Sequence, residues 1–195
     1  MAKKQKVNLP TSNLKDLTKF LVITDRVNNL EEYLERFSIT LSVLQTPESL
    51  TRTAYELAED CWNDGVRYLE LRYSPILHTE KGMTPSESID AVKKGLEQAE
   101  EDFAIQTGII ICGIRNISPD ISFSLAELAV EYKNRGVVGF DLAGEEENFP
   151  AKEHRKAFYL IQNNNINSTI HAGEAYGPTS IHQSIHYCSA NRIGH

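Results

Sequence analysis

The sequence has little cysteine and no long apolar run. Its three cysteines, Cys61, Cys112 and Cys188, are too few and too scattered among 195 residues for a disulfide framework. An odd number also cannot pair fully within one chain, so we expect reduced thiols. No apolar run approaches the roughly 20 residues of a membrane helix, and no apolar stretch follows the basic start as a secretory signal requires. We therefore expect a cytoplasmic protein with no membrane partner.

Basic residues are fewer than acidic ones, and several common motifs are absent. There are 20 Lys and Arg against 27 Asp and Glu, a net charge of −7, and the densest basic group is a short N-terminal cluster. A nucleic-acid partner is not expected, because phosphate binding needs a clustered basic face. The Walker loop, the G-x-G-x-x-G loop and the G-x-S-x-G elbow are missing. With 41% hydrophobic and 24% charged residues, the composition is that of a globular protein.

Apolar residues at steps of three and four predict two helices, and helix start and stop signals predict two more. Thr46, Thr84 and Ser118 are each followed by proline and can cap helices, and Gly65 and Gly136 supply stop signals. The predicted helices cover residues 29–44, 46–65, 84–103 and 118–136.

Short β-prone runs alternate with these helices, and two of them, 108–114 and 137–142, are nearly continuously apolar. Such runs are typical of parallel strands buried on both faces. The alternation predicts right-handed βαβ units, hence an α/β fold, without separating an open sheet from a closed barrel. Functional residues are expected on loops after the carboxyl ends of strands. The candidate strands are 66–73, 108–114, 137–142, 168–171 and 192–194.

Polar side chains occur on or directly after several of these strands. Glu70 and Arg72 share one face of the first strand, where we favour a structural ion pair over a ligand site, because an unpaired buried charge is costly. Arg115 follows the second strand, and Asp141 ends the third. Gly144 either exposes its backbone N–H to a ligand or makes a tight turn.

The fourth strand ends in the most specific pattern, His171-Ala-Gly-Glu174. An imidazole and a carboxylate three residues apart suit metal binding or acid and base chemistry. His195 follows the fifth strand at an equivalent position. His182 and His186 have chelating spacing but lack a nearby third ligand, so we favour a solvated or packed helix face. For the acidic run 145–147 we favour a solvated loop.

Four segments, which occur in the same order as in the family, resemble adenosine deaminases. These proteins are zinc enzymes of the amidohydrolase superfamily. The resemblance extends along essentially the whole chain and implies a (β/α)₈ TIM barrel, of which the five strands are the second to sixth. We therefore expect residues 1–195 to form a single partial barrel domain, truncated at both ends. The segments are 69–75, 136–144, 171–178 and 192–195.

The resemblance implies a role for several residues. His171 would be a zinc ligand, and Glu174 would be the acid that protonates purine N1. His195 would orient or deprotonate the metal-bound water, and the backbone N–H of Gly144 would bind purine N3. An apolar lid over the nucleoside would include Leu34, Phe37 and Leu41, whose helical spacing equally allows a core role.

The sequence also departs from the family pattern. It has no H-x-H pair and no Asp-Asp pair, so it holds one of four protein ligands for Zn²⁺. A catalytic zinc normally has at least three, so we expect the chain alone neither to hold zinc tightly nor to deaminate.

The function expected of the parent enzyme is hydrolytic deamination of adenosine or 2′-deoxyadenosine, within purine metabolism. The alternatives are an AMP or adenine deaminase, a non-catalytic product that binds a nucleoside or a protein, or a chain completed by a complementing polypeptide. Open barrel edges also invite self-association.

Overall fold

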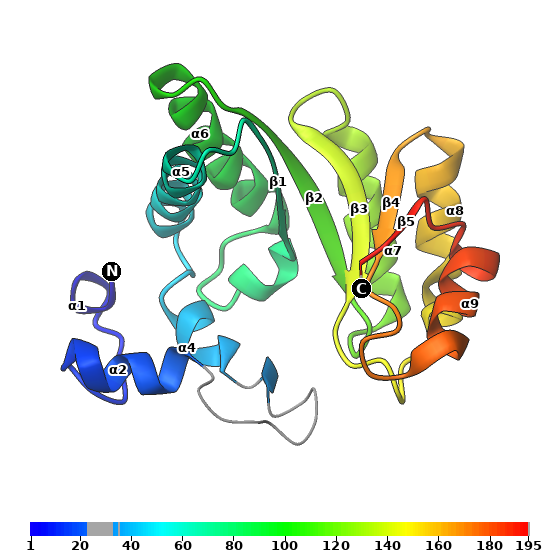
Figure 1. The fold of residues 1–195 in the computed structure, drawn as a ribbon, viewed down its shortest axis with the longest axis horizontal. Helices are drawn as coiled ribbons and strands as arrows, with labels where there is room; N and C mark the ends of the chain where they lie inside the picture. The colour runs from blue at the N-terminus through cyan, green and yellow to red at the C-terminus, as the bar shows by residue number, and fades with distance from the viewer. Residues whose placement is uncertain (23–32, 35, 195) are drawn as a thin grey trace.

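A computed structural model describes residues 1–22, 33–34 and 36–194 of the chain. In these residues five parallel strands form one sheet in the sequential order β1-β2-β3-β4-β5 (Figure 1). All five predicted strands are present, with ends shifted by one or two residues. They are β1 (Tyr68–Tyr73), β2 (Gln106–Ile114), β3 (Val137–Ala143), β4 (Asn167–Ile170) and β5 (Arg192–Ile193).

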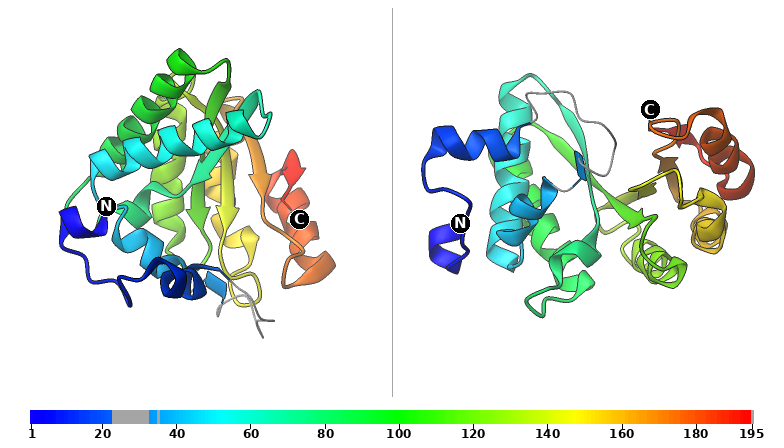
Figure 2. Two further views of the ribbon diagram at one scale, coloured as in Figure 1. Left: turned by 60° about the vertical axis from the view of Figure 1, so that its left-hand side comes forward. Right: turned by 90° about the horizontal axis from the view of Figure 1, so that it is seen from below.

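A helix lies in every connection between consecutive strands, as parallel pairing requires. The view from below in Figure 2 shows the helices following one another along an arc outside the strands, so the sheet is a curled half-barrel. The helices are α1 (Ala2–Gln5), α2 (Leu14–Leu21), α4 (Phe37–Ser42), α5 (Pro47–Asn63), α6 (Pro85–Asp102), α7 (Pro119–Glu131), α8 (Arg155–Asn163) and α9 (Gly177–Cys188). None of the described helices is long and apolar enough to cross a membrane.

Three of the four predicted helix starts are confirmed by their capping hydrogen bonds. Thr46 and Ser49 form a reciprocal capping box at α5, and Thr84 and Glu87 form another at α6. The Ser118 side chain accepts a hydrogen bond from an N–H of the first turn of α7. These contacts satisfy N–H groups that the helix itself leaves without acceptors.

Two predicted helix boundaries were wrong. α7 ends at Glu131 and not at Gly136, because the chain turns there through a left-handed residue, Asn134, before β3 begins. The first predicted helix, 29–44, is helical at residues 33–34 and over Phe37–Ser42 as α4, with a turn at Arg36 between them, and its residues 29–32 and 35 lie outside the described part. The end of α7 had been placed at the Gly136 stop signal, although residues 133–136 carry no apolar side chain and the backbone already turns at Asn134.

The two faces of the sheet differ in chemistry. The core lies between the outer face and the helices and includes Ile109, Ile111, Phe140 and Leu142. The inner face carries polar side chains, and Arg192 Nη2 on β5 donates to Glu70 Oε2 on β1 at 2.8 Å. Because β1 and β5 are the two edges of the sheet, this ion pair spans the inside of the half-barrel.

The three cysteines are free, as expected from their number and spacing. Cys112 and Cys188 are buried and Cys61 is half-buried. Burial raises the pKa of the Cys188 thiol to about 12, so this side chain packs as a neutral group.

A close approach of α5 and α6 depends on Gly95. A Cβ added there would lie 2.1 Å from the Thr51 backbone oxygen and 3.0 Å from the Ala54 Cβ. The backbone oxygen cannot move without shifting the whole of α5. Gly95 is therefore required by packing, although glycine weakens a helix interior.

We predict that Gly95→Ala lowers the free energy of unfolding by about 2 kcal/mol or more, because overpacking outweighs the gain in helix propensity. Urea denaturation followed by circular dichroism measures the change. Gln98→Ala, an exposed change in the same helix, is the matched control and is expected to be neutral or slightly stabilising. Equal stability of the Gly95 variant and the parent would contradict the packing requirement.

Candidate functional site at the carboxyl ends of the strands

A buried carboxylate, Asp141 on β3, lies close to side chains from β1, β2 and the end of β4. Its side chain is fully buried, and Oδ2 lies 3.3 Å from Arg72 Nε on β1 and 3.0 Å from His171 Nδ1 after β4. The Cys112 thiol on β2 donates to the same oxygen at 3.5 Å. Burial, and then the neighbouring Asp141, raise the pKa of Cys112, so the thiol stays a neutral donor. Residues from β1, β2, β3 and the end of β4 thus meet at one carboxylate.

The ion pair expected between Glu70 and Arg72 is not formed. Arg72 is bound to Asp141, and Glu70 accepts from Arg192 and from the Tyr68 hydroxyl. The expectation that each charge has a partner was right, but the partner was wrong. Because the sheet curls, strands far apart in sequence place opposite charges on the same inner face, which spacing within one strand cannot reveal.

His171 and Glu174 lie on the turn that joins β4 to α9. His171 directly follows the last residue of β4 and is partly buried, with its side chain 16% exposed. Gly173 has a φ of +89°, in the left-handed region that favours glycine, and a Cβ there would lie 2.9 Å from the Ile181 Cδ1. Glu174 follows and is exposed. The sequence placed this turn correctly at a strand end.

The Arg115 guanidinium lies beneath this turn and is fully buried. Nη2 donates to the His171 carbonyl oxygen at 2.6 Å, and Nη1 donates to the Phe149 carbonyl oxygen at 3.1 Å. The Arg115 carbonyl oxygen in turn lies 3.2 Å from His154 Nε2. Arg115 was singled out as a strand-end guanidinium, and it is part of the support of the site.

The acidic run at 145–147 is not uniformly a solvated loop, which corrects our interpretation of it. Glu146 is only 1% exposed. Its carboxylate accepts hydrogen bonds from the backbone N–H groups of Gly173, Ala175 and Tyr176 and from the Ser180 hydroxyl. Three consecutive acids give no sequence signal for which one turns inward, so sequence reasoning missed this residue.

The remaining predicted substrate-binding residues are less closely tied to this cluster. Gly144 follows β3 with a φ of +102°, and a Cβ there would lie 2.9 Å from Asn116 Oδ1. α4, with Phe37 and Leu41, contacts α2 and lies at the end of the sheet toward which β3 runs (Figure 1). Leu34 is half-buried, whereas Phe37 is 46% exposed. His195 lies outside the described residues.

The described residues do not form a zinc centre by themselves. Within residues 1–22, 33–34 and 36–194, no group of three or more His, Cys, Asp or Glu comes together with the arrangement of a metal site. The His182 and His186 rings lie with centroids 4.3 Å apart and their planes tilted by 41° on α9, where both residues are exposed. A catalytic zinc takes three protein ligands, and of the ligands that the resemblance implies only His171 is present.

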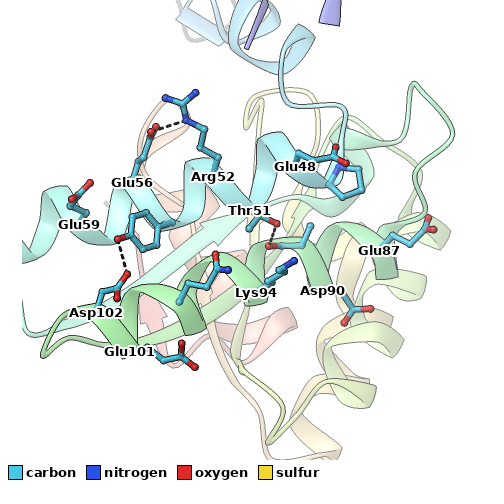
Figure 3. Close-up of a pocket in the computed structure, with 14 residues that line it drawn as sticks. Glu48, Thr51, Arg52, Glu56, Glu59, Glu87, Asp90, Lys94, Glu101 and Asp102 are labelled. Carbon is cyan, nitrogen blue, oxygen red and sulfur yellow. Dashed lines mark hydrogen bonds and ion pairs between the residues drawn. The ribbon is translucent and has the colours of Figure 1, made fainter. Parts of the chain in front are cut away.

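A hollow of about 930 Å³ lies away from this cluster, between the outer helices α5 and α6. Figure 3 shows that many of its labelled side chains are acidic, Glu48, Glu56, Glu59, Glu87 and Asp102 among them. The dashed contacts join α5 to α6 or lie within α5, including Arg52 to Glu56 at 2.7 Å. This hollow belongs to the helix packing and not to the strand ends.

A parallel half-barrel with helices on its outer side and polar side chains at the carboxyl ends of its strands has the architecture of part of a (β/α) barrel. The family described as adenosine deaminase matches residues 1–195, and the chain belongs to that family. A probable adenosine deaminase from Dictyostelium discoideum is 45% identical over 195 residues, 100% of this chain and 25% of the relative. An adenosine deaminase from Mycobacterium ulcerans is 41% identical over 192 residues, 96% of this chain and 52% of the relative.

Solved structures show the same architecture. An adenine deaminase from Arthrobacter aurescens has a TM-score of 0.86 at 22% identity, covering 98% of this chain and 57% of its own. An amidohydrolase from Burkholderia ambifaria with bound Zn has a TM-score of 0.85 at 20% identity, and the match covers 98% of this chain and 52% of that protein. Arabidopsis ADAL complexed with IMP has a TM-score of 0.84 at 25% identity, covering 100% and 57%. The chain thus spans about half the length of these proteins, and the predicted barrel fold is confirmed.

We predict that the two ion pairs on the inner face, Arg72 with Asp141 and Arg192 with Glu70, contribute differently to the free energy of unfolding. Arg72→Met leaves the buried Asp141 carboxylate without its guanidinium and is expected to cost about 3 kcal/mol. Arg192→Met is the matched control: it breaks an ion pair whose side chains are 57% and 25% exposed, so it should cost about 1 kcal/mol or less. Urea denaturation measures both, and equal losses would contradict the importance of the buried carboxylate.

We also predict that stability falls as the pH drops below about 6.5, partly because of His154. Burial lowers the pKa of His154. The hydrogen bond to the Arg115 carbonyl raises this pKa in part, and the positive charge of Arg115 lowers it. The unfolded chain then binds the proton more readily, so the stabilisation is complete above the unfolded pKa and is lost on acidification. Comparison of urea midpoints at pH 7.5 and pH 5.5 should show a smaller loss for His154→Gln. Equal losses would exclude this role.

Proposed function

We propose that this chain forms the part of an adenosine deaminase that positions the purine ring and protonates it. The observation that carries the proposal is the cluster at the carboxyl ends of β3 and β4, where His171 lies 3.0 Å from the buried Asp141 and Glu174 lies three residues further along the turn. The 41% to 45% identity to proteins named adenosine deaminase supports adenosine as the substrate.

In this proposal each residue has one role in the reaction. Glu174 donates a proton to purine N1, which makes C6 more electrophilic toward water. The backbone N–H of Gly144 binds purine N3, and His171 supplies one imidazole to the metal centre of the complete enzyme. His195 orients or deprotonates the attacking water. Adenosine and water become inosine and ammonia. The lid of Leu34, Phe37 and Leu41 would keep bulk solvent, but not the reacting water, out of the site.

Nucleotides are the second candidate class of substrate. The Arabidopsis protein similar to this chain is complexed with IMP, and an N6-methyl-AMP deaminase from Arabidopsis is 26% identical. Phosphate recognition calls for arginine or lysine in the site. Arg72, Arg115 and Arg192 all contact carboxylates within the chain, which favours the nucleoside over the nucleotide.

The chain alone is expected to lack activity, since Glu174 is exposed and one predicted zinc ligand is present. The decisive test therefore replaces the matching segment of the Mycobacterium ulcerans adenosine deaminase with this chain. We expect the chimera to convert adenosine to inosine, followed by ultraviolet absorbance, and to prefer adenosine over AMP and adenine. Glu174→Gln in the same chimera should lower kcat by about 10²- to 10⁴-fold.

The isolated chain is the matched control for the chimera. It should contain much less than one zinc per chain by elemental analysis and should show no turnover. Stoichiometric zinc with ordinary turnover in the isolated chain would contradict the proposal that it is one part of the enzyme. A folded, zinc-containing chimera that prefers AMP or adenine would contradict the proposed substrate.

A further inference from the structure

Glu146 provides a buried carboxylate with an unusually complete set of hydrogen bonds. Oε1 accepts from the Gly173 N–H at 2.9 Å and from the Ser180 hydroxyl at 2.7 Å. Oε2 accepts from the N–H groups of Ala175 at 2.6 Å and Tyr176 at 2.9 Å. A carboxylate has about four lone-pair sites, so all of them are used.

These donors bracket the candidate catalytic residue. Gly173 and Ala175 are the two neighbours of Glu174 in the chain, and both N–H groups point at the same carboxylate. Tyr176 is the N-cap residue of α9, and its side chain makes no capping hydrogen bond. Glu146, from the loop after β3, therefore supplies the negative charge and the acceptors that the start of this helix lacks locally.

Arg115 holds the other end of the same turn. Its Nη2 donates to the His171 carbonyl oxygen at 2.6 Å and lies 3.9 Å from Glu146 Oε1. Both side chains are fully buried, so their opposite charges offset much of the cost of removing each from water. The turn from His171 to Tyr176 is thus fixed at its start by a guanidinium and along its length by a carboxylate.

We propose that Glu146 is a positioning residue that fixes the backbone carrying Glu174 relative to His171, through peptide N–H groups and without touching the substrate. The consequence for catalysis rests on the proposed deaminase function, whereas the consequence for the turn does not. Misplacing a catalytic group by about 1 Å can cost about 10²-fold in rate, so such a support has a measurable effect.

The first test uses the 195-residue chain. Glu146→Gln keeps the size of the side chain but replaces one acceptor oxygen with an NH₂ group that faces N–H donors. We expect the Gly173, Ala175 and Tyr176 amides to exchange with solvent at least about tenfold faster by NMR, and their proton shifts to move upfield. Amides in the middle of β2 should be unchanged.

Glu145→Gln is the matched control, because Glu145 is the adjacent acid and contacts only the Asn148 side chain among its described hydrogen-bond partners. It should leave all three amides unchanged. Glu146→Asp, which retains the charge but is one methylene shorter, should give an intermediate effect and serves if the glutamine variant does not fold. Unchanged exchange in both Glu146 variants would overturn the proposal.

The second test measures turnover in the chimera described above. Glu146→Gln should lower kcat by about 10²-fold with little change in KM for adenosine, while Glu145→Gln should change neither. Loosened amides with unchanged kcat would refute the positioning role. An inactive parent chimera would instead count against the proposed function and would leave the exchange experiment to decide the role of Glu146 in the turn.

Discussion

The buried Arg115 guanidinium constrains the loops that follow three consecutive strands of the sheet. It follows β2, donates to a carbonyl in the loop after β3 and to another directly after β4, and lies beside the Glu146 carboxylate. A buried guanidinium is tolerated only where its donors and charge find partners. Loops from three consecutive βα units must therefore adopt the conformations that supply those partners, and the site is built on those loops.

Two groups of charges occupy this end of the half-barrel and have different tasks. Arg72, Asp141 and His171 lie on the inner face, where Asp141 pairs with the other two side chains. Arg115 and Glu146 lie beneath the loops and hold mainly backbone groups. The second group keeps the geometry on which the first depends, which is a general requirement of preorganised sites.

Elements of the fold could be predicted from the sequence where their signals are local. Contacts that only the tertiary structure brings together could not be predicted in this way. Thr46 and Thr84 cap helices through residues three positions away, so pattern alone located both helices. The end of α7 was missed, because the left-handed turn at Asn134 has no periodic signature. His171 and Glu174 stood out because they are close in sequence. Glu146 did not, because its donors lie 27 to 34 residues away.

Two requirements of catalysis differ on the open inner face of the half-barrel: the arrangement of the charged side chains and the exclusion of water. The internal pairs, Arg72 with Asp141 and Arg192 with Glu70, give these inward charges partners within the chain, so their arrangement is set by the chain itself. Water still reaches part of this face, because Arg192 is 57% exposed and Glu174 is exposed. Electrostatic interactions in a site strengthen only when water is displaced from it. The geometry of the turn is thus set by residues of this chain, and the reaction proposed for it would also need bulk water displaced from the exposed Glu174.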